Sequence, residues 1–513
     1  MFGSEKVLLA CALLFAAACG GEKQYTVSGK VSGATAEGVV VTLSGGGGIS
    51  TTSTTSGGLY SLTAVGGSYT LTPSKDLYTF SPPSKSLNLN SGDVVGQDFT
   101  ATALGGALDG SFGGEGKVTA GAGSRNGNLT SVAVQADGRI LAGGILWYSA
   151  TTAASFVVSR YLPDGTLDDS FASGGTATTT FGNNPCYVTG LAIQADQKIV
   201  AAGSILGPPS SGFALARYTA EGSLDPSFGS SGTVMTVVGA GSAANAVALQ
   251  PDGKILVAGM STPSSTSSSQ PFALARYNAD GSLDAAFGNG GTVMTAIGTD
   301  QDGINSLAVQ ADGKIVVAGY SNYGSPGEPA MALARYNADG SLDPTFGSSG
   351  KLTTLFDNGN LSWASGVTVQ PDGKIVASGF SDASYPFNSR TFAFARYLPD
   401  GTLDWAFGSS GKVTGTPVSQ ANALAIQADG KIIFAGAATS TSPGRSAFLV
   451  ARLRADGQID RRFGIQGSVT TMFSTDGDEA TGIAIQADGK VVVVGRAGWP
   501  PGPVSFSLAR YWP

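Results

Sequence analysis

A sequence repeat constrains the fold of this 513-residue chain more than any other feature. The segment Gln-X-Asp-Gly-Lys recurs with small variations, and its glutamines lie 59, 56, 60, 60, 57 and 59 residues apart. They are Gln135, Gln194, Gln250, Gln310, Gln370, Gln427 and Gln486. A repeat of this kind indicates one supersecondary unit that buries its apolar face against neighbouring copies. We therefore expect seven units between residue 104 and residue 513.

Each repeat has the pattern of two β-hairpins. In the third repeat, residues 246–250 alternate in period two, turn at 251–253 and resume as an apolar run at 254–259. Residues 272–277 then lead into Asn278-Ala279-Asp280-Gly281, and a strand is expected from Gly281 onward. Short turns that end in glycine suit hairpins that need a residue at positive φ. This predicts four antiparallel strands per repeat. In the second repeat Gln197 replaces the turn glycine, so an altered turn is expected there.

Side-chain size alternates along the third predicted strand of each repeat. In the third repeat Phe272 and Leu274 fall on one face, and Ala273 and Ala275 fall on the other. A bulky face can pack on the small residues of the next sheet at native density. The alternation therefore predicts face-to-face stacking of sheets.

The recurring segments identify a known repeat family. A second segment follows each Gln-X-Asp-Gly-Lys, as in Phe272-Ala-Leu-Ala-Arg-Tyr-Asn-Ala-Asp-Gly-Ser-Leu-Asp284 and then Phe287-Gly288. Together they resemble the delta-60 repeat, a bacterial family regarded as β-propeller blades of unassigned function. The resemblance covers residues 104–513 and implies an all-β, seven-bladed β-propeller.

The two ends of the repeat region predict how the propeller closes. The last repeat stops at residues 506–513 and lacks its outer strand, whereas residues 107–113 precede the first repeat and match the missing piece. We expect this N-terminal outer strand to pair with the C-terminal blade, which removes exposed strand edges. Arg510 would then face Asp109, as each recurring arginine faces an aspartate across its turn. One structural ion pair per blade is the plain interpretation, and a charge ring that binds a ligand is the alternative.

Residues 25–102 form a separate segment of short apolar runs between Gly, Ser and Thr turns, which is typical of a small all-β domain. Runs such as Val27–Val31, Gly38–Leu43 and Tyr78–Pro82, in this order, resemble the carboxypeptidase regulatory-like (transthyretin-like) β-sandwich. The resemblance implies a spacer or adhesive module. Residues 44–58, rich in Gly, Ser and Thr, are expected to be a flexible loop.

The N-terminus has the pattern of an export signal. A twelve-residue apolar run ends at Ala18, too short to span a membrane, and small residues precede Cys19. This resembles the lipobox of bacterial lipoproteins, although Ala16 stands where leucine is usual. The resemblance implies a signal peptide at 1–18, lipid attachment at Cys19 and a tether at 19–24. Ordinary cleavage after Ala18 is the alternative.

Lipid attachment implies a membrane partner, and the glycines after Cys19 indicate the outer membrane. The protein is expected there as a lipoprotein, on the periplasmic or the surface side. With Cys11 removed and Cys19 lipidated, only Cys186 would remain, and no intramolecular disulfide could form.

Composition excludes several kinds of function. Histidine is absent, which rules out a Ser/His/Asp triad, a histidine base and a histidine-ligated metal. The formal net charge of −7, from 29 basic and 36 acidic residues, argues against a nucleic-acid partner. A monomer is expected.

The connections between strands suggest where a ligand would bind. The Asp-Gly turns should all lie on one face of the propeller, and the longer, variable connections on the other. Loops on a rigid scaffold are common binding sites, so we expect the variable face to carry the site. Aromatic candidates for ligand contact there are Trp147, Tyr148, Tyr323, Tyr385 and Trp499. Half-buried packing explains them equally well.

Two acidic clusters in the same connections are candidates for calcium, which takes six to eight oxygen ligands. They consist of Asp300, Asp302, Asp476, Asp478 and Glu479. Neither cluster is a full ligand set, and solvated turns are the alternative. No other cofactor is expected.

These observations favour a lipid-anchored, exported protein whose propeller is a non-catalytic binding or adhesion module for a glycan or a protein. An enzyme is not expected, because the acids recur with the repeats and no paired-carboxylate arrangement is visible. The alternatives are a carbohydrate-active enzyme, a glycosidase or lyase using loop carboxylates, and a purely structural surface protein.

Overall fold

The computed structural model describes residues 23–46, 48–120, 126–147, 154–207, 211–264, 269–322, 329–356, 361–382, 390–415, 419–439, 446–499 and 502–513. The chain divides into two compact units, Met1–Leu104 and Gly105–Pro513. In the part described, every regular element is a β-strand. None of the described residues belongs to a helix that is long and apolar enough to cross a membrane.

The first unit consists of two four-stranded sheets. One has the order β4 (Leu59–Val65), β1 (Gln24–Gly33), β8 (Phe99–Ala103), β6 (Tyr78–Ser81). The other has the order β3 (Gly48–Ser53), β2 (Val40–Gly45), β5 (Ser68–Ser74), β7 (Lys85–Asn88). Val27 and Val31 of β1 share one buried cluster with Val41 and Leu43 of β2. The alternating apolar side chains of the two sheets therefore make a single core.

The expectation of a loop at residues 44–58 was wrong. Residues 48–53 form β3, which pairs antiparallel with β2 from Val40↔Ser53 to Gly45↔Gly48. The side chains of β3 alternate between half-buried and exposed, with Ile49 exposed. A strand at a sheet edge needs few apolar residues, because backbone hydrogen bonds to one neighbour suffice.

The described residues of the second unit form seven four-stranded sheets, numbered here in chain order. The first three are β10 (Asn126–Val134), β11 (Ile140–Trp147), β12 (Ser155–Tyr161), β13 (Thr176–Thr179); β14 (Cys186–Ile193), β15 (Ile199–Ile205), β16 (Gly212–Tyr218), β17 (Thr233–Thr236); and β18 (Gly241–Leu249), β19 (Ile255–Thr262), β20 (Phe272–Tyr277), β21 (Thr292–Thr295). The fourth and fifth are β22 (Asp302–Val309), β23 (Ile315–Asn322), β24 (Pro329–Tyr336), β25 (Lys351–Thr354); and β26 (Leu361–Val369), β27 (Ile375–Asp382), β28 (Thr391–Tyr397), β29 (Lys412–Gly415). The sixth and seventh are β30 (Ser419–Ile426), β31 (Ile432–Thr439), β32 (Ser446–Leu453), β33 (Ser468–Thr471); and β34 (Asp478–Ile485), β35 (Val491–Ala497), β36 (Ser505–Tyr511), β9 (Lys117–Ala120).

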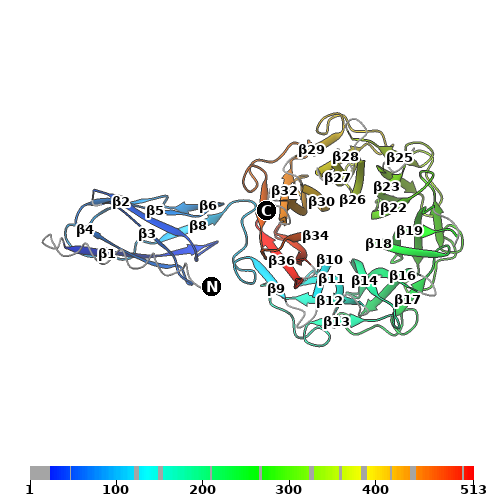
Figure 1. Ribbon diagram of the computed structural model, residues 1–513, viewed down its shortest axis with the longest axis horizontal. Coiled ribbons are helices and arrows are strands. Elements are labelled where there is room, and N and C mark those ends of the chain that lie inside the picture. The colour runs from blue at the N-terminus through cyan, green and yellow to red at the C-terminus, as the bar shows by residue number, and fades with distance from the viewer. Residues whose placement is uncertain are drawn as a thin grey trace, which may run out of the picture. The chain divides into compact units, whose positions relative to one another are not determined.

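Within this unit the sheets are arranged around a centre, with the first strand of each sheet innermost (Figure 1). Each first strand contacts the first strand of the next sheet, and β10 contacts both β14 and β34. Every first strand also carries a bulge near its middle, and in six of them a polar side chain there donates a hydrogen bond to a backbone carbonyl of the following sheet. The pairs are Thr130–Val188, Thr189–Ala244, Asn245–Ile304, Asn305–Ala364, Asn422–Ala480 and Thr481–Leu129.

Packing between sheets follows the predicted alternation of size, which is confirmed. Phe272 and Leu274 of β20 lie in one buried cluster with Ala332 and Ala334 of the fourth sheet. The opposite face of β20 supplies alanines to a cluster with Phe213 and Leu215 of the second sheet. Each of these two interfaces thus joins a bulky face to a small one, which allows close packing of the sheets.

The outer strand of the seventh sheet comes from the start of the unit. β9 pairs antiparallel with β36, from Phe506↔Ala120 to Ala509↔Lys117. Residues 107–113, expected to be this strand, instead form the turn that precedes it and make one bridge, Leu108↔Tyr511.

The same displacement occurs in every sheet, because a second turn separates the Asp-Gly hairpin from the outer strand. In the third sheet the strand begins at Thr292 rather than Gly281. Asp284 folds back onto Arg276, and Phe287 packs under the guanidinium with its ring centroid 4.5 Å away.

Candidate functional site

Two arrangements of polar side chains in the repeat region differ in how they relate to the repeat: one lines cavities beside the Asp-Gly turns, and the other is a row of side chains at the opposite ends of the strands. One recurs from sheet to sheet, and the other is confined to part of the ring. A site made for the scaffold should be the same in every sheet, whereas a ligand site on a symmetric scaffold needs side chains that the other sheets lack.

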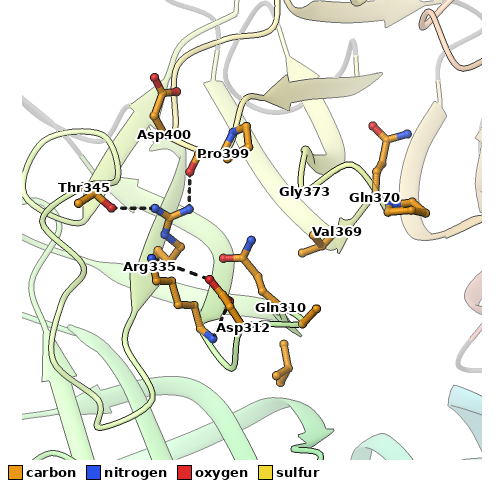
Figure 2. Close-up of a pocket in the computed structure, with 13 residues that line it drawn as sticks. Gln310, Asp312, Arg335, Thr345, Val369, Gln370, Gly373, Pro399 and Asp400 are labelled. Atoms are coloured by element: carbon orange, nitrogen blue, oxygen red, sulfur yellow. Dashed lines mark hydrogen bonds and ion pairs between the residues drawn. The ribbon is translucent and has the colours of Figure 1, made fainter.

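The recurring place is a cavity of about 720 Å³ beside the Asp-Gly turns of the fourth and fifth sheets (Figure 2). Arg335 crosses it, and its guanidinium donates to Asp343 Oδ2 at 2.7 Å, Thr345 Oγ1 at 3.2 Å and the carbonyl of Pro399 in the next sheet. A cavity of about 550 Å³ has the same lining around Arg217. This place belongs to the scaffold.

The arginine–aspartate pairs predicted from the sequence are confirmed. Each joins an arginine Nε to an aspartate Oδ2 at 2.7–2.9 Å. They are Arg160–Asp168, Arg217–Asp225, Arg276–Asp284, Arg335–Asp343, Arg396–Asp404, Arg452–Asp460 and Arg510–Asp109. In six of them the guanidinium also donates to a backbone carbonyl of the next sheet. The pairs therefore link neighbouring sheets.

The second place lies at the opposite ends of the strands, among the variable connections, and begins with aromatic rings. Trp363, near the start of β26, stacks on Tyr320 of the fourth sheet with ring centroids 4.8 Å apart. On its other side Trp363 contacts Phe380 of β27 at 5.4 Å. The guanidinium of Arg390, just before β28, lies 4.5 Å from the centroid of the Phe380 ring.

Charged and amide side chains continue this row across the sixth and seventh sheets. Arg390 Nη1 donates to Gln420 Oε1 at 2.8 Å, and Gln420 Nε2 donates to Glu479 Oε1 at 2.9 Å. Glu479 Oε2 accepts from Arg496 Nη2 at 2.6 Å. The guanidinium carbon of Arg496 lies 3.5 Å from the ring centroid of Trp499. We call the eight residues the aromatic–ionic band: Tyr320, Trp363, Phe380, Arg390, Gln420, Glu479, Arg496 and Trp499.

The band breaks the symmetry of the repeat at one position. This position lies two residues before the bulged residue of each first strand, and from the first to the seventh sheet it holds Asn128, Tyr187, Ala243, Gly303, Trp363, Gln420 and Glu479. Opposite it on the second strands lie Ile145, Ser204, Met260, Tyr320, Phe380, Ala437 and Arg496. At these two positions, among the described residues, two aromatic or two ionic residues face each other in the fifth sheet, as Trp363 and Phe380, and in the seventh, as Glu479 and Arg496.

Burial and charge hold the band in place while leaving parts of it accessible. Tyr320, Trp363, Gln420, Glu479 and Arg496 are half-buried, and Trp499 is exposed. Burial and the negative charge of Asp302 raise the pKa of the Tyr320 hydroxyl, which therefore stays protonated at neutral pH. The band thus offers flat apolar surfaces beside fixed hydrogen-bonding groups, the combination found in sites for small polar molecules.

The aromatic residues singled out from the sequence have different environments. Trp499 belongs to the band, and 43% of its surface is exposed. Trp147 ends β11 in the first sheet, pairs with Asn126 and is half-buried, and it is not a member of the band. Tyr148, Tyr323 and Tyr385 lie outside the described residues.

The acidic residues proposed for calcium have internal partners. Asp302 accepts backbone hydrogen bonds from Ile297 at 2.7 Å and Gly298 at 3.2 Å, and Asp478 likewise accepts from Phe473 and Ser474. Glu479 belongs to the band.

The other two acidic candidates, Asp300 and Asp476, are exposed. Among the described residues no group of three or more Cys, Asp or Glu could hold a metal ion. Cys19, the predicted lipid attachment site, lies outside the described residues. Cys186 is buried in the second sheet, and burial raises the pKa of its thiol.

Six members of the band were missed from the sequence. Tyr320, Trp363, Phe380, Gln420 and Arg496 lie on strands rather than in connections, and Arg390 lies immediately before β28. Aligning the repeats on their Gln-X-Asp-Gly segments would have revealed a variable column in which the fifth, sixth and seventh repeats carry tryptophan, glutamine and glutamate. Connection lengths alone could not reveal these residues, because their side chains precede or follow the connections.

Comparison with known proteins finds a family model that matches six of the repeats. The family model "Domain of unknown function (DUF5122) beta-propeller" matches residues 135–171, 194–228, 250–287, 310–346, 370–407 and 427–463. A search of curated proteins finds no match.

Several solved structures are similar in fold. A catalytically inactive virginiamycin B lyase from Staphylococcus aureus with quinupristin has 11% identity and a TM-score of 0.43, covering 77% of this chain and 98% of the lyase. A protein of unknown function from Dyadobacter fermentans has 13% identity, a TM-score of 0.40 and coverages of 77% and 97%. The polysaccharide lyase Uly1 has 11% identity, a TM-score of 0.42 and coverages of 75% and 89%. None of these likenesses carries a function to this chain. The six family matches show that the repeat region contains a β-propeller segment.

Proposed function

We propose that the propeller is a non-catalytic binding module for a glycan, and that the aromatic–ionic band is its binding surface. The observation that carries the proposal is the confinement of the band to the fourth to seventh sheets, at one end of the strands. Sugar rings present C–H groups on their faces and hydroxyls at their edges. The exposed ring of Trp499 can stack on such a face, and Gln420, Glu479 and Arg496 can exchange hydrogen bonds with the hydroxyls.

The scaffold of this proposal is a closed propeller of seven blades with delta-60-type repeats. The contact of β10 with β34, the hydrogen bond from Thr481 to Leu129 and the pairing of β9 with β36 support closure by the N-terminal segment. For residues 25–102 we propose a carboxypeptidase regulatory-like β-sandwich that acts as a spacer. Its two sheets with a shared core support this assignment.

The location of the protein is part of the same proposal. The sequence before Gln24 favours export and lipid attachment at Cys19, so that the propeller would meet its ligand at the outer membrane. Labelled palmitate should enter the wild-type protein during expression in a bacterial host and should be absent from Cys19→Ser. Equal labelling of the two would contradict the lipid anchor.

A glycan array tests the binding function. The protein without residues 1–19 should bind a restricted set of glycans, and Trp499→Ala should lose most of that signal because its exposed ring would be a stacking surface. Trp147→Ala, a tryptophan outside the band, is the matched control and should retain the wild-type profile. An empty array, or equal loss in both variants, would contradict the proposal.

A further inference from the structure

A second symmetry-breaking residue lies on the connection between β28 and β29. Trp405 follows Asp404, the partner of Arg396, and 78% of its surface is exposed. At the same position the other repeats have Gly110, Asp169, Pro226, Ala285, Pro344 and Arg461. The scaffold therefore does not require an aromatic residue here. Tryptophan is mostly buried in proteins, so a ring exposed to this degree calls for a reason outside the fold.

Trp405 lines a groove of about 590 Å³. Serines 409 and 410, Lys412 and Gln458 of the sixth sheet also line it and supply hydroxyl, ammonium and amide groups. Lys412 is held in place, because its Nζ donates to the carbonyl of Leu355 at 2.7 Å and lies 5.8 Å from the Phe356 ring centroid. An exposed ring thus borders a trough of positioned hydrogen-bonding groups.

The groove follows β29, the outer strand of the fifth sheet, so an added peptide strand is the obvious rival occupant. The strand itself disfavours that occupant. β29 has four residues, Lys412–Gly415, and it begins with a lysine at the groove. Short edge strands that carry lysine are the features by which proteins prevent strand addition. A hydroxyl-rich ligand that stacks on the indole fits the lining better.

We propose that Trp405 and this groove form a second saccharide-binding site, separate from the aromatic–ionic band. The sugar stacks on the indole, and its hydroxyls exchange hydrogen bonds with Ser409, Ser410 and Gln458. Because the two sites share no residue, a polymer with repeated sugar units could occupy both, and binding to the polymer would then exceed binding to its short fragments.

The test separates the two sites by removing one at a time. The probes are soluble hexasaccharides of glucose, N-acetylglucosamine and mannose, added to the protein without residues 1–19 while the heat of binding is recorded by titration calorimetry. In a background of Trp363→Ala and Trp499→Ala, which disables the band, at least one hexasaccharide should still bind. Adding Trp405→Ala should weaken that binding by about tenfold or more. Trp405→Ala introduces the residue found in the third repeat, so the melting temperature should stay unchanged.

Ala285→Trp in the third repeat is the matched control. It places an exposed tryptophan at the equivalent position without the groove residues of the fifth sheet, and it should add no binding. The inference is overturned if Trp405→Ala leaves hexasaccharide binding in the band-disabled background intact, if none of the three binds there, or if Ala285→Trp gains equal binding. The effect of the band variants on glycan binding tests the proposed function of the band. It does not test the inference about the groove, which depends on Trp405→Ala.

Discussion

Equivalent residues in this chain either repeat because the scaffold needs them or differ because it does not. The glycine of the Gln-X-Asp-Gly turn shows the first case. It has φ between 80° and 85° at Gly138, Gly253, Gly313, Gly373, Gly430 and Gly489. In the second repeat Gln197 occupies the same left-handed region at φ 66° and keeps the turn hydrogen bonds to Gln194. The expectation of an altered turn was wrong, since the flanking strands impose the turn on a residue that disfavours it.

Gln197→Gly should therefore stabilise the protein. Glycine avoids the steric cost of a side chain at positive φ, and the gain expected is about 1 kcal/mol in the free energy of unfolding. Urea unfolding of wild type and variant measures it. The reverse change, Gly253→Gln in the third repeat, should cost a similar amount. If Gln197→Gly destabilised the protein, the Gln197 side chain would contribute more to the free energy of unfolding than its strained backbone conformation costs.

The aspartates of the inter-sheet pairs determine how stability depends on pH. Burial raises the pKa of Asp225, but hydrogen bonds from Ser227 and Lys198 and the charge of Arg217 outweigh it, so that the pKa lies below its ordinary value. The pKa is likewise lowered at five equivalent positions: Asp109, Asp168, Asp284, Asp343 and Asp404.

A lowered pKa in the folded state means that the stabilisation is present above the unfolded pKa, about 3.9, and is lost as the pH falls below it. Since histidine is absent, the urea midpoint should stay level from pH 8 to pH 5 and fall below about pH 4. A marked loss of stability between pH 7 and pH 5 would contradict this assignment.

At the scale of elements, the seam between β36 and β9 joins the two ends of the propeller. Asp109 is buried there and pairs with Arg510 at 2.8 Å and Lys490 at 3.2 Å. Asp109→Ala would leave Arg510 buried without its carboxylate, and such a loss costs about 3–5 kcal/mol.

The Asp109→Ala variant should therefore have a clearly lower melting temperature than the wild type. The decrease should be at least as large as that caused by Asp284→Ala, which breaks the equivalent pair inside the third sheet. Asp169→Ala, at an exposed position, should change stability by no more than about 0.5 kcal/mol. If Asp109→Ala behaved like Asp169→Ala, the seam would not carry the stability of the ring.

The same scale shows how far the sequence predicts the structure. The turns of the first hairpins and the alternation at Phe272–Ala275 could be inferred because glycine and side-chain size report local geometry directly. The start of β21 could not be inferred, since the chain turns back at Asp284 to pair with Arg276, and this contact spans a turn that has no local sequence signal. β3 was missed because a strand stabilised by backbone pairing alone has no apolar pattern. In the candidate site, Trp499 was found by its aromatic character, whereas Trp363 and Gln420 stand out only when the seven repeats are compared position by position.

For the whole molecule, the contrast between its repeated and its unequal parts is the main result. Lysine, arginine and aspartate at the Asp-Gly turns serve every sheet alike, so much of the formal charge of −7 belongs to the scaffold. The aromatic–ionic band and Trp405 depart from this pattern at different places. A symmetric ring can acquire a ligand site without loss of stability when the positions that change make no contact that the ring requires.

Titration calorimetry with a glycan selected on the array tests the central claim most directly. The claim is that binding depends on the unequal sheets, so Trp363→Ala should weaken binding by about tenfold or more, because its indole lies in the centre of the aromatic part of the band. Tyr187→Ala removes an aromatic ring at the equivalent position of the second sheet and should leave the dissociation constant unchanged. Equal effects of the two variants, or no effect of Trp363→Ala, would contradict the assignment of the band as the binding surface.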